Sequence, residues 1–288
     1  MPVLRHAYLI MAHADFALLR TLVSALDDAD HDIYVHIDRK VKELPELHAG
    51  HAALEVFQEV DVRWGDLSVV EAEYALFGRA LQHGGYAYYH LLSGSDLPIK
   101  PVHQIKRFFA DHAGTDFVDV YPCPAKELDR HFRRYHLFPD RFKSGGLASL
   151  AVRAVRAFFL RLQMLTGWRR NRDIDFRKGS QWLSLTEPTL REVMGAHDWV
   201  RQIFHHTFCP DEVFVQTICA RSLRARRLIS DDGWGTWHYR YIDWSGHHVH
   251  TLTQADAGRL RDSDALFARK FSSDSPEIIE TVLQWLQA

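Results

Sequence analysis

The sequence contains few cysteines: three among 288 residues, namely Cys123, Cys209 and Cys219, none of them in a CxxC pair. An odd number of scattered thiols argues against a disulfide framework and against a structural zinc site. The chain also lacks an excess of charge, because 35 Lys and Arg against 37 Asp and Glu give a net charge of -2. No overall basic field therefore indicates a nucleic-acid partner.

Long apolar runs are absent too, since none approaches the roughly 20 residues that span a bilayer. The first residues, 1–6, do not show the charged, apolar and small-residue order of a secretory signal. We therefore expect a cytoplasmic protein. With 47% hydrophobic and 25% charged residues, the composition is that of an ordinary globular protein with one large or two small domains.

Strand and helix patterns alternate along the first 125 residues. Apolar or β-branched runs at 7–12, 32–37, 54–57 and 86–92 predict strands, and helical spacing of apolar residues predicts helices at 16–26 and from 67 onwards. Alternation of this kind is typical of an open parallel sheet that binds nucleotides. Such sheets bind ligands outside the carboxyl ends of their strands, which here means near His13, Asp38 and Asp96.

The segment 126–178 is strongly basic, with 14 Lys and Arg and five Asp and Glu, a local balance of 14 − 5 = +9. Within it, 147–168 predicts an amphipathic helix that carries Arg153, Arg156 and Arg161. One interpretation is a solvated basic face packed on the sheet. The other is a surface that binds anionic lipid or a phosphate-bearing acceptor.

Several common site motifs are missing. The sequence has no GxxxxGK[ST], no GxGxxG after a strand and no HExxH. The D-x-D pattern, which holds a divalent metal in many sugar-nucleotide transferases, occurs four times, at 28–30, 30–32, 173–175 and 262–264. None of these follows a strand of the first half at the usual place, so we expect no metal site.

Two short motifs are candidates for chemistry. Glu212 follows Pro210 and Asp211 in a helix-initiation pattern, where an acid serves as a cap or, with substrate bound, as a general base. Arg269 and Lys270 are adjacent cations between aromatic residues. They are either a surface pair or a pair that neutralises a diphosphate, since arginine chelates phosphate oxygens and lysine adds a compact charge.

Taken together, six short blocks resemble the core-2/I-branching enzymes and peptide O-xylosyltransferases of glycosyltransferase family 14. They occur in the order of that family and extend over nearly the whole chain: 6–12 with 33–39, 62–65, 91–100, 179–182, 210–212 and 266–271. Each block is short, and their shared order makes the resemblance specific.

The resemblance implies an α/β, GT-A-like nucleotide-sugar-binding fold with a Rossmann-like central sheet flanked by helices. We expect one such domain over 1–288, with a nucleotide-binding half at 1–125 and an acceptor-binding and catalytic half at 126–288. It further implies an inverting transfer of a GlcNAc-class or xylose-class sugar from a UDP-sugar to a glycan hydroxyl. Neither a metal nor another cofactor is expected, and the UDP-sugar is a co-substrate.

By the same resemblance, Glu212 is the catalytic base, and Arg269 and Lys270 bind the donor diphosphate. The residues implied at the uridine and donor site are Met11, Ala12, His13, Asp38, Arg39, Trp64 and Asp96. Those implied at the sugar and acceptor site are Gln181 and Trp182.

Some positions depart from the family pattern. The xylosyltransferases carry aspartate at Gln181, which leaves the donor sugar open. Branching enzymes have a further arginine where this chain has His250, so the arginine here is expected to be Arg269. The membrane anchor and disulfides of the animal relatives are absent, which favours a bacterial enzyme of cell-surface or exopolysaccharide synthesis.

Its expected acceptor is a glycan or a lipid-linked glycan, with peripheral contact to an anionic inner-membrane face through 126–178. Two alternatives remain: a metal-dependent GT-A transferase of another family that uses 30–32, and a nucleotide-sugar-binding protein without turnover.

Overall fold

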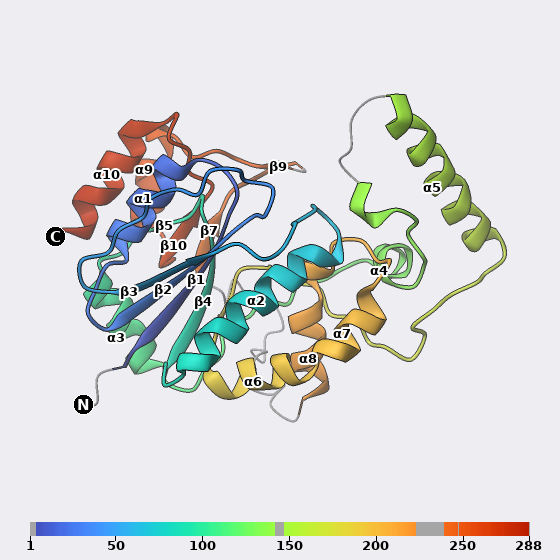
Figure 1. The fold of residues 1–288 in the computed structure, drawn as a ribbon, viewed down its shortest axis with the longest axis horizontal. Coiled ribbons are helices and arrows are strands. Elements are labelled where there is room, and N and C mark those ends of the chain that lie inside the picture. Colours follow the sequence, from blue (N-terminus) through green and yellow to red (C-terminus); the bar gives the residue numbers. More distant parts are fainter. Residues whose placement is uncertain (1–3, 142–146, 223–238, 247, 288) are drawn as a thin grey trace.

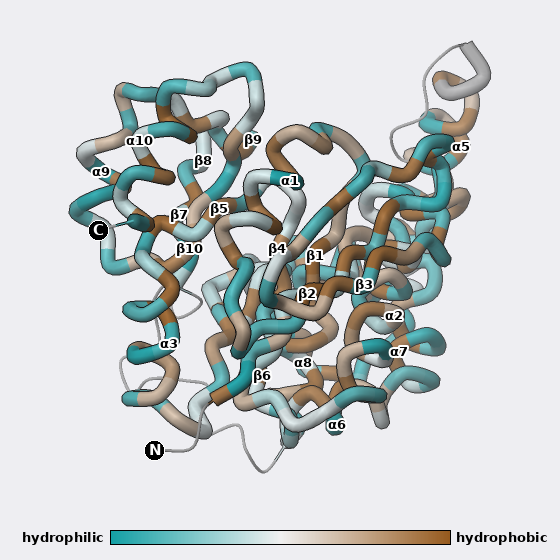
Figure 2. The backbone as a smooth tube through the Cα atoms, turned by 60° about the vertical axis from the view of Figure 1, so that its left-hand side comes forward, coloured by the Kyte–Doolittle hydropathy of each residue, from teal (hydrophilic) through white to brown (hydrophobic). Residues whose placement is uncertain are grey.

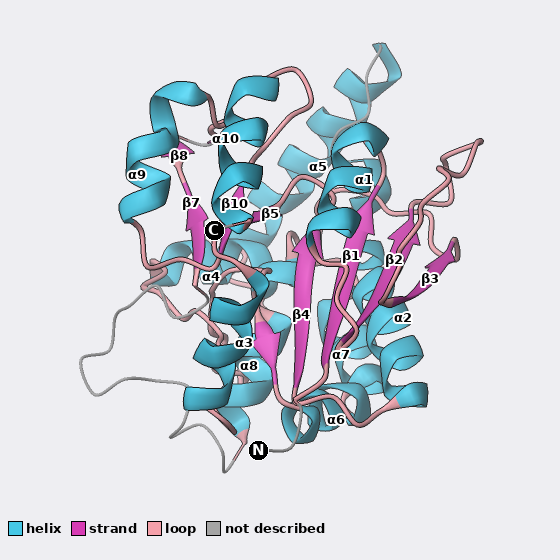
Figure 3. Ribbon diagram, turned by 90° about the vertical axis from the view of Figure 1, so that its left-hand side faces the viewer, coloured by secondary structure: helices cyan, strands magenta, loops and turns pink. Residues whose placement is uncertain are grey.

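The computed structural model describes residues 4–141, 147–222, 239–246 and 248–287, which fold around one central sheet (Figure 1). Its strand order is β3 (Ala53–Phe57), β2 (His31–Ile37), β1 (His6–Ala12), β4 (Tyr88–Ser93) and β6 (Ser184–Leu185). β1, β2, β3 and β4 are parallel, and β6 runs antiparallel to β4 (Figure 3). The fold class predicted from the sequence, α/β with a Rossmann-like central sheet, is confirmed.

The central strand β1 is buried on both faces of the sheet. Ala7 and Leu9 belong to one hydrophobic cluster with residues of α2 (Leu67–His83), whereas Tyr8 and Ile10 belong to a second cluster with residues of α1 (Phe16–Ala25). Alternate side chains of a strand point to opposite faces. A strand covered on both faces requires a nearly continuous apolar run, which Figure 2 shows along β1.

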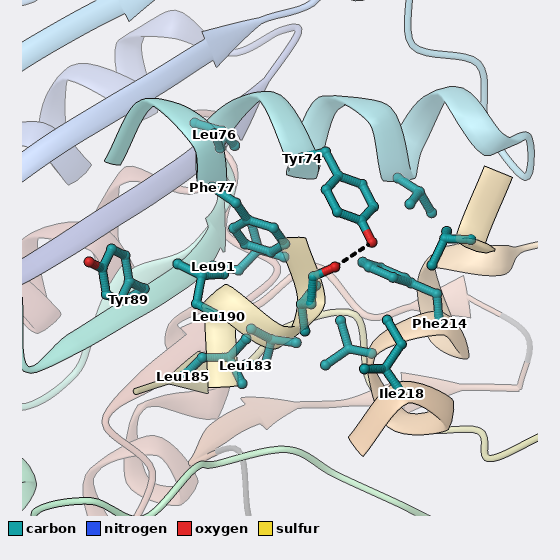
Figure 4. Close-up of a cluster of buried hydrophobic side chains, with 14 of the residues drawn as sticks. Tyr74, Leu76, Phe77, Tyr89, Leu91, Leu183, Leu185, Leu190, Phe214 and Ile218 are labelled. Atoms are coloured by element: carbon teal, nitrogen blue, oxygen red, sulfur yellow. Dashed lines mark hydrogen bonds between the residues drawn. The ribbon is translucent and has the colours of Figure 1, made fainter. Parts of the chain in front are cut away.

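One face of the sheet is covered by α2 together with α6 (Glu187–Gly195), α7 (His197–Phe204) and α8 (Phe214–Arg221) (Figure 1). Figure 4 shows this cluster, in which the Tyr74 hydroxyl donates to the Val193 carbonyl oxygen over 3.0 Å. That bond lets a buried tyrosine satisfy its polar end while its ring fills the core. The face is therefore closed by helices from the middle of the chain.

The other face is covered by α1, α3 (Val102–Asp111), α9 (Ala257–Asp262) and α10 (Pro276–Leu286). A second sheet lies there, with the order β5 (Leu97–Pro98), β10 (Phe267–Arg269) and β7 (Arg240–Ile242). β5 follows β4 almost directly in the chain. β10 pairs antiparallel with β5. This pairing brings the end of the chain beside the carboxyl end of β4. Besides α5, the remaining elements of the described residues are α4 (Ala125–Phe132), η1 (Pro139–Arg141), η2 (Pro210–Glu212), β8 (Trp244–Ser245), β9 (His248–Val249) and η4 (Gln254–Asp256).

Helix α5 (Leu147–Leu165) stands apart from the rest of the molecule (Figure 1). It is attached near its end, where Gln163 exchanges hydrogen bonds of 2.8 and 2.9 Å with the main chain of Tyr135. Large apolar side chains on it are exposed, among them Phe158 at 67% and Leu165 at 85%. The predicted helix 147–168 is thus present but ends three residues earlier, before Gly167, whose φ of 67° turns the chain. No helix in the described ranges is long and apolar enough to cross a membrane.

Candidate active site

The carboxyl ends of β1, β2 and β4 meet at one edge of the sheet, where main-chain hydrogen bonds join the loops that leave them. Asp38 N donates to Ala12 O over 2.9 Å, and Gly94 N donates to Met11 O over 2.8 Å. A Cβ at Gly94 would lie 2.9 Å from Ala12 Cβ, so the absence of a side chain allows this close approach. The structure thus brings together three loops that the sequence predicted to bind ligand.

A pocket of about 330 Å³ opens between the loops after β1 and β4 and the segment after β10. Its lining includes Met11, Ala12 and His13, predicted at the donor site, and Lys270, predicted at the diphosphate. The lining residues that the sequence analysis did not single out are Ala14, Asp15, Ser93, Gly94, Ser95, Thr251, Phe271, Ser272, Ser273 and Asp274. The pocket lies where open α/β sheets bind their ligands.

Beside this pocket, Arg269 contacts two residues that were predicted from separate motifs. Its Nε lies 3.2 Å from Asp96 Oδ1, and its Nη2 donates to Ser93 Oγ over 3.4 Å. Its Cζ lies 4.3 Å from the centroid of the Trp182 ring, a cation–π contact. The carboxylate of Asp96 is also fixed by the Ser93 main-chain N–H at 3.0 Å. Asp96, Trp182 and Arg269 therefore form one cluster.

The two charges of this cluster are largely shielded from water, with 1% of the Asp96 side chain and 16% of the Arg269 side chain exposed. Burial raises the pKa of Asp96, an effect that the Arg269 charge opposes. Burial likewise lowers the pKa of Arg269, and Asp96 opposes that shift. Arg269 is not among the residues that line the pocket, whereas the exposed Lys270 is. Of the predicted cation pair, Lys270 is thus the member at the pocket surface.

Glu212 lies in the short turn η2 that precedes α8. Pro210 and the two acids do begin a helix, as the sequence predicted, but it is a three-residue 3-10 helix, which Val213, with φ −138°, separates from α8. α8 begins at Phe214. The Glu212 side chain is 31% exposed, so its carboxylate is accessible from solvent.

Lys178, which the sequence analysis missed, links Glu212 to a second acid. Its Nζ lies 3.3 Å from Glu212 Oε2 and donates to Glu127 Oε1 over 2.7 Å. Burial by itself opposes the charged ammonium, but the hydrogen bond to Glu127 and the charge of Glu212 outweigh it and raise the pKa of Lys178. Its position directly before the 179–182 block was the available signal.

Gly179 places the segment after Lys178 tightly against the rest of the site. Its N–H donates to Glu212 O over 2.8 Å, and a Cβ here would lie 1.8 Å from Asp119 O. Any other residue would collide with that carbonyl group. From Gly179, three residues of extended chain, about 10 Å at most, lead to Trp182. The predicted base and the Arg269 cluster therefore lie at two ends of one short segment.

Between these ends, the Gln181 side chain contacts residues of two other elements. Its Nε2 donates to Glu73 Oε1 over 2.9 Å and lies 3.6 Å from Met11 Sδ. Glu73 is completely buried on α2 and was also missed. It lies at helical spacing from the buried Val70 and Phe77, and an acid on an apolar helix face is the signal that could have found it.

Four predicted donor-site residues are not among those that line the pocket: Asp96, described above, and Asp38, Arg39 and Trp64. Asp38 is buried at the end of β2, where its Oδ2 lies 2.7 Å from Lys40 Nζ. Arg39 is exposed. Trp64 is 50% exposed and packs its ring edgewise against another aromatic ring, 5.4 Å between centroids. Asp38 and Arg39 thus follow β2, whereas Trp64 lies in the connection between β3 and α2.

The D-x-D pattern at 30–32, which the metal-dependent alternative would use, lies at the opposite edge of the sheet. Asp32 belongs to the amino-terminal end of β2 and lies 2.7 Å from Arg5. Asp30 forms an ion pair with Lys106. These carboxylates are thus held by cations away from the pocket, and no group of three His, Cys, Asp or Glu within the described residues is arranged to hold a metal ion.

Comparisons with known proteins agree with the resemblance noted in the sequence. The family model described as Core-2/I-Branching enzyme matches residues 6–264. A comparison with curated proteins finds no match.

Two solved structures are weakly similar. The apo-form glycosyltransferase GlyE of Streptococcus pneumoniae TIGR4 has 9% sequence identity and a TM-score of 0.34, with 99% of this chain and 60% of that chain covered. Apo mouse xyloside xylosyltransferase 1 has 10% identity and a TM-score of 0.37, with 94% and 99% covered. The chain thus spans 60% of the length of the first of these proteins.

Proposed function

This chain belongs to the Core-2/I-Branching enzyme family and is a glycosyltransferase, and we propose that it moves a GlcNAc-class or xylose-class sugar from a UDP-sugar to a glycan hydroxyl. The observation that carries this proposal is the cluster of Asp96, Trp182 and Arg269 beside a pocket at the carboxyl ends of β1 and β4. Arginine binds phosphate through charge-assisted hydrogen bonds. An indole ring packs against a sugar ring, and a carboxylate accepts a hydrogen bond from a sugar hydroxyl.

In this proposal the donor lies across the pocket. Met11, Ala12 and His13 contact the nucleotide, with Asp38, Arg39 and Trp64 at the rim. Lys270 contacts the diphosphate from the pocket surface, where it is exposed. Arg269 reaches the same phosphates only if its guanidinium contacts them and Asp96 at the same time. Its Nη2 is the atom available for this, because its hydrogen bond to Ser93 is long, at 3.4 Å.

The reaction we propose is a single displacement. Glu212 takes the proton from the acceptor hydroxyl, whose oxygen attacks the anomeric carbon on the face opposite the nucleotide. The bond from that carbon to the diphosphate oxygen breaks, and UDP leaves with the electron pair. An α-linked donor therefore gives a β-linked product. Lys270 and Arg269 stabilise the charge that grows on the leaving diphosphate, which is the task a metal ion performs in other transferases.

We also propose that α5 docks on an anionic lipid surface. The helix has three arginines, Arg153, Arg156 and Arg161, and no acidic residue, while apolar side chains such as Phe158 and Leu165 are exposed. Arginine with exposed apolar side chains is the composition of interfacial helices on anionic membranes. Such docking would present lipid-linked glycans to the pocket. Residues 142–146 of the basic segment lie outside the described residues.

Vesicle sedimentation tests this docking. We expect the protein to bind vesicles of phosphatidylcholine with phosphatidylglycerol more than vesicles of phosphatidylcholine alone, and Phe158→Ser/Leu165→Ser to lose most of this binding. Equal binding by the variant contradicts the proposal. So does a lipid-independent dimer that the variant abolishes, because a second copy of the chain would then be the partner of α5.

Calorimetric titration with UDP, with and without EDTA, tests the donor site. We expect binding that survives EDTA and is lost in Arg269→Ala/Lys270→Ala. Binding that requires metal would favour a metal-dependent transferase. Binding of a UDP-sugar that is never consumed, whatever glycan acceptor is supplied, would indicate a nucleotide-sugar-binding protein instead.

A further inference from the structure

Glu212 has another acid as its neighbour in η2. The Oδ1 atom of Asp211 is buried and has no hydrogen-bond partner among the described residues. Burial raises the pKa of Asp211 to about 7, and the negative charge of Glu212 adds to this shift. Repulsion between like charges favours the protonated form of a carboxyl group, and in that form it cannot act as a base.

One cation contacts the Glu212 carboxylate. Within the described part of the chain, the only side chain that forms an ion pair or hydrogen bond with it is Lys178, whose Nζ lies 3.3 Å from Glu212 Oε2. The Lys178 side chain is 20% exposed, and attraction between opposite charges is stronger where water is partly excluded. This ammonium therefore offsets the repulsion between the two acids of η2.

Main-chain hydrogen bonds fix the place of this lysine. Lys178 O accepts from Tyr121 N over 3.0 Å, and Gly179 N donates to Glu212 O over 2.8 Å. The backbone that carries the ammonium is thus joined directly to the backbone that carries the carboxylate. Because both side chains start from fixed and neighbouring points, their contact costs less conformational entropy than one between two mobile side chains.

Glu127 on α4 gives the ammonium a second partner. Lys178 Nζ donates to Glu127 Oε1 over 2.7 Å, and this hydrogen bond lowers the pKa of Glu127. When Glu212 takes up a proton, its carboxylate becomes neutral and no longer balances the ammonium. A largely shielded charge without a partner is costly, and Glu127 prevents that state.

We propose that Lys178 is a positioning residue that holds Glu212 by its Oε2 and keeps it charged until it takes the proton of the acceptor hydroxyl, and that Glu127 retains the ammonium afterwards. The inference rests on the proposed function, because it takes Glu212 as the base. The proton passes from the acceptor oxygen to Glu212, and none passes to or from Lys178. The lysine therefore acts through Glu212.

The pH dependence of kcat/KM tests this, since its acid limb reports the base of the free enzyme. UDP release from UDP-GlcNAc and from UDP-xylose is measured over about pH 5–9, with water or a glycan as acceptor. We expect Lys178→Met to move the acid limb to higher pH by about 1 unit, the lower end of the effect of a nearby opposite charge. The rate then falls about tenfold on the acid side and stays within about twofold on the plateau. Lys178→Arg restores the limb, because it restores the charge.

Glu127→Gln should move the acid limb the other way, to lower pH, because the ammonium then acts on Glu212 alone. General loosening of the site would lower the rate at every pH and would not shift the limb in opposite directions. An unmoved limb in either variant, or shifts of the same sign, overturns the proposal. Should Lys178→Met fail to fold, Glu127→Gln decides.

Other groups near Glu212 also titrate. Those that face it or its neighbours are Asp211 in η2, Glu73 on α2, Glu127 and His131 on α4, and Tyr121 and Cys123 in the segment before α4. Among these, Asp211 has its pKa within the range of the assay. The Lys178→Met shift should therefore persist in an Asp211→Asn background. A shift that disappears there shows that Lys178 acts on Asp211, which overturns the proposal.

Lys106→Met is the matched control. Lys106 on α3 is 28% exposed and also lies between two acids, with Nζ 3.1 Å from Asp28 Oδ1 and in an ion pair with Asp30. These residues lie at the opposite edge of the sheet from the pocket, so the acid limb should stay in place. A shift equal to that of Lys178→Met would show a general effect of losing a lysine and would overturn the proposal.

The two proposals fail in distinguishable ways. If the unaltered protein releases no UDP from either UDP-sugar, or if Glu212→Gln releases it undiminished, the proposed function or its base is wrong and the role of Lys178 falls with it. If turnover is present and depends on Glu212 but the acid limb ignores Lys178 and Glu127, the base stands and only the positioning role is wrong.

Discussion

The guanidinium of Arg269 stacks on the indole of Trp182, with 4.3 Å between Cζ and the ring centroid. Arg269 ends β10 in the three-stranded sheet, and Trp182 lies two residues before the first residue of β6 in the five-stranded sheet. The contact therefore joins the two sheets beside the pocket. Because Asp96 holds the same guanidinium, Arg269 links the side chains of Asp96 and Trp182.

Removing the acid from this cluster should destabilise the protein. In Asp96→Ala the largely buried guanidinium of Arg269 loses its counter-charge, which lowers the free energy of unfolding by about 3–5 kcal/mol. Asp61→Ala removes a partly exposed partner of Arg63 and should change it by about 0–1 kcal/mol. Urea denaturation measures both values. Equal losses in the two variants would show that Arg269 does not depend on Asp96.

Gly179→Ala should disrupt the segment that joins Glu212, the proposed base, to the proposed donor site. The added Cβ would lie 1.8 Å from Asp119 O, a backbone atom that cannot rotate aside as the end of a flexible side chain can. We expect soluble yield and thermal stability to fall sharply. Gly195→Ala is the control, because a Cβ there meets nothing within 4 Å. A Gly179→Ala protein as stable as the control would contradict the close packing.

Glu212→Gln should remove turnover and keep donor binding. A neutral amide of the same shape cannot accept the acceptor's proton, and loss of a general base slows catalysis by about 10²–10⁴-fold. UDP affinity, measured by calorimetry, should remain unchanged. Glu277→Gln, on the exposed surface of α10, should retain full activity. Undiminished turnover in Glu212→Gln would disprove the assignment of the base.

Acid should weaken the fold through histidines buried in the core. His6 Nδ1 lies 2.8 Å from His90 Nε2, and His90 Nδ1 lies 2.8 Å from Ser184 Oγ. Burial lowers the pKa of His6 to about 3 and that of His90 well below its ordinary value. Both histidines are therefore neutral in the folded protein and, below about pH 6.5, protonated in the unfolded chain.

The contribution of the two histidines to the free energy of unfolding is therefore fully present above pH 6.5 and is lost as the pH falls below that value. Each of these histidines lowers the free energy of unfolding by about 1.4 kcal/mol for every unit that the pH falls, until the pH reaches its pKa in the folded protein. Urea denaturation at pH 7.5 and 5.5 should show the loss, and His90→Gln should make it smaller. A free energy of unfolding that stays constant over this range would contradict the prediction.

Local pattern was sufficient for much of the fold. The apolar run at 7–12 and the helical spacing after 67 correspond to β1 and α2, because both elements bury a continuous set of side chains. The break between η2 and α8 was missed, since the non-helical backbone of the single residue Val213 leaves no trace in apolar spacing. The division into halves at 125 stays a prediction, although β6, from the second half, pairs with β4 of the first.

The sequence by itself determined the order of strands and helices from β1 to β4, the family and which short motifs carry polar chemistry, because these depend on neighbours in the chain. Only the tertiary structure decided that Arg269 is held by Asp96 and Trp182, and that Glu73 binds Gln181 from 108 positions away. Such contacts join residues from different strands and helices. Their strength depends on burial and distance in space, which no local spacing in the sequence encodes.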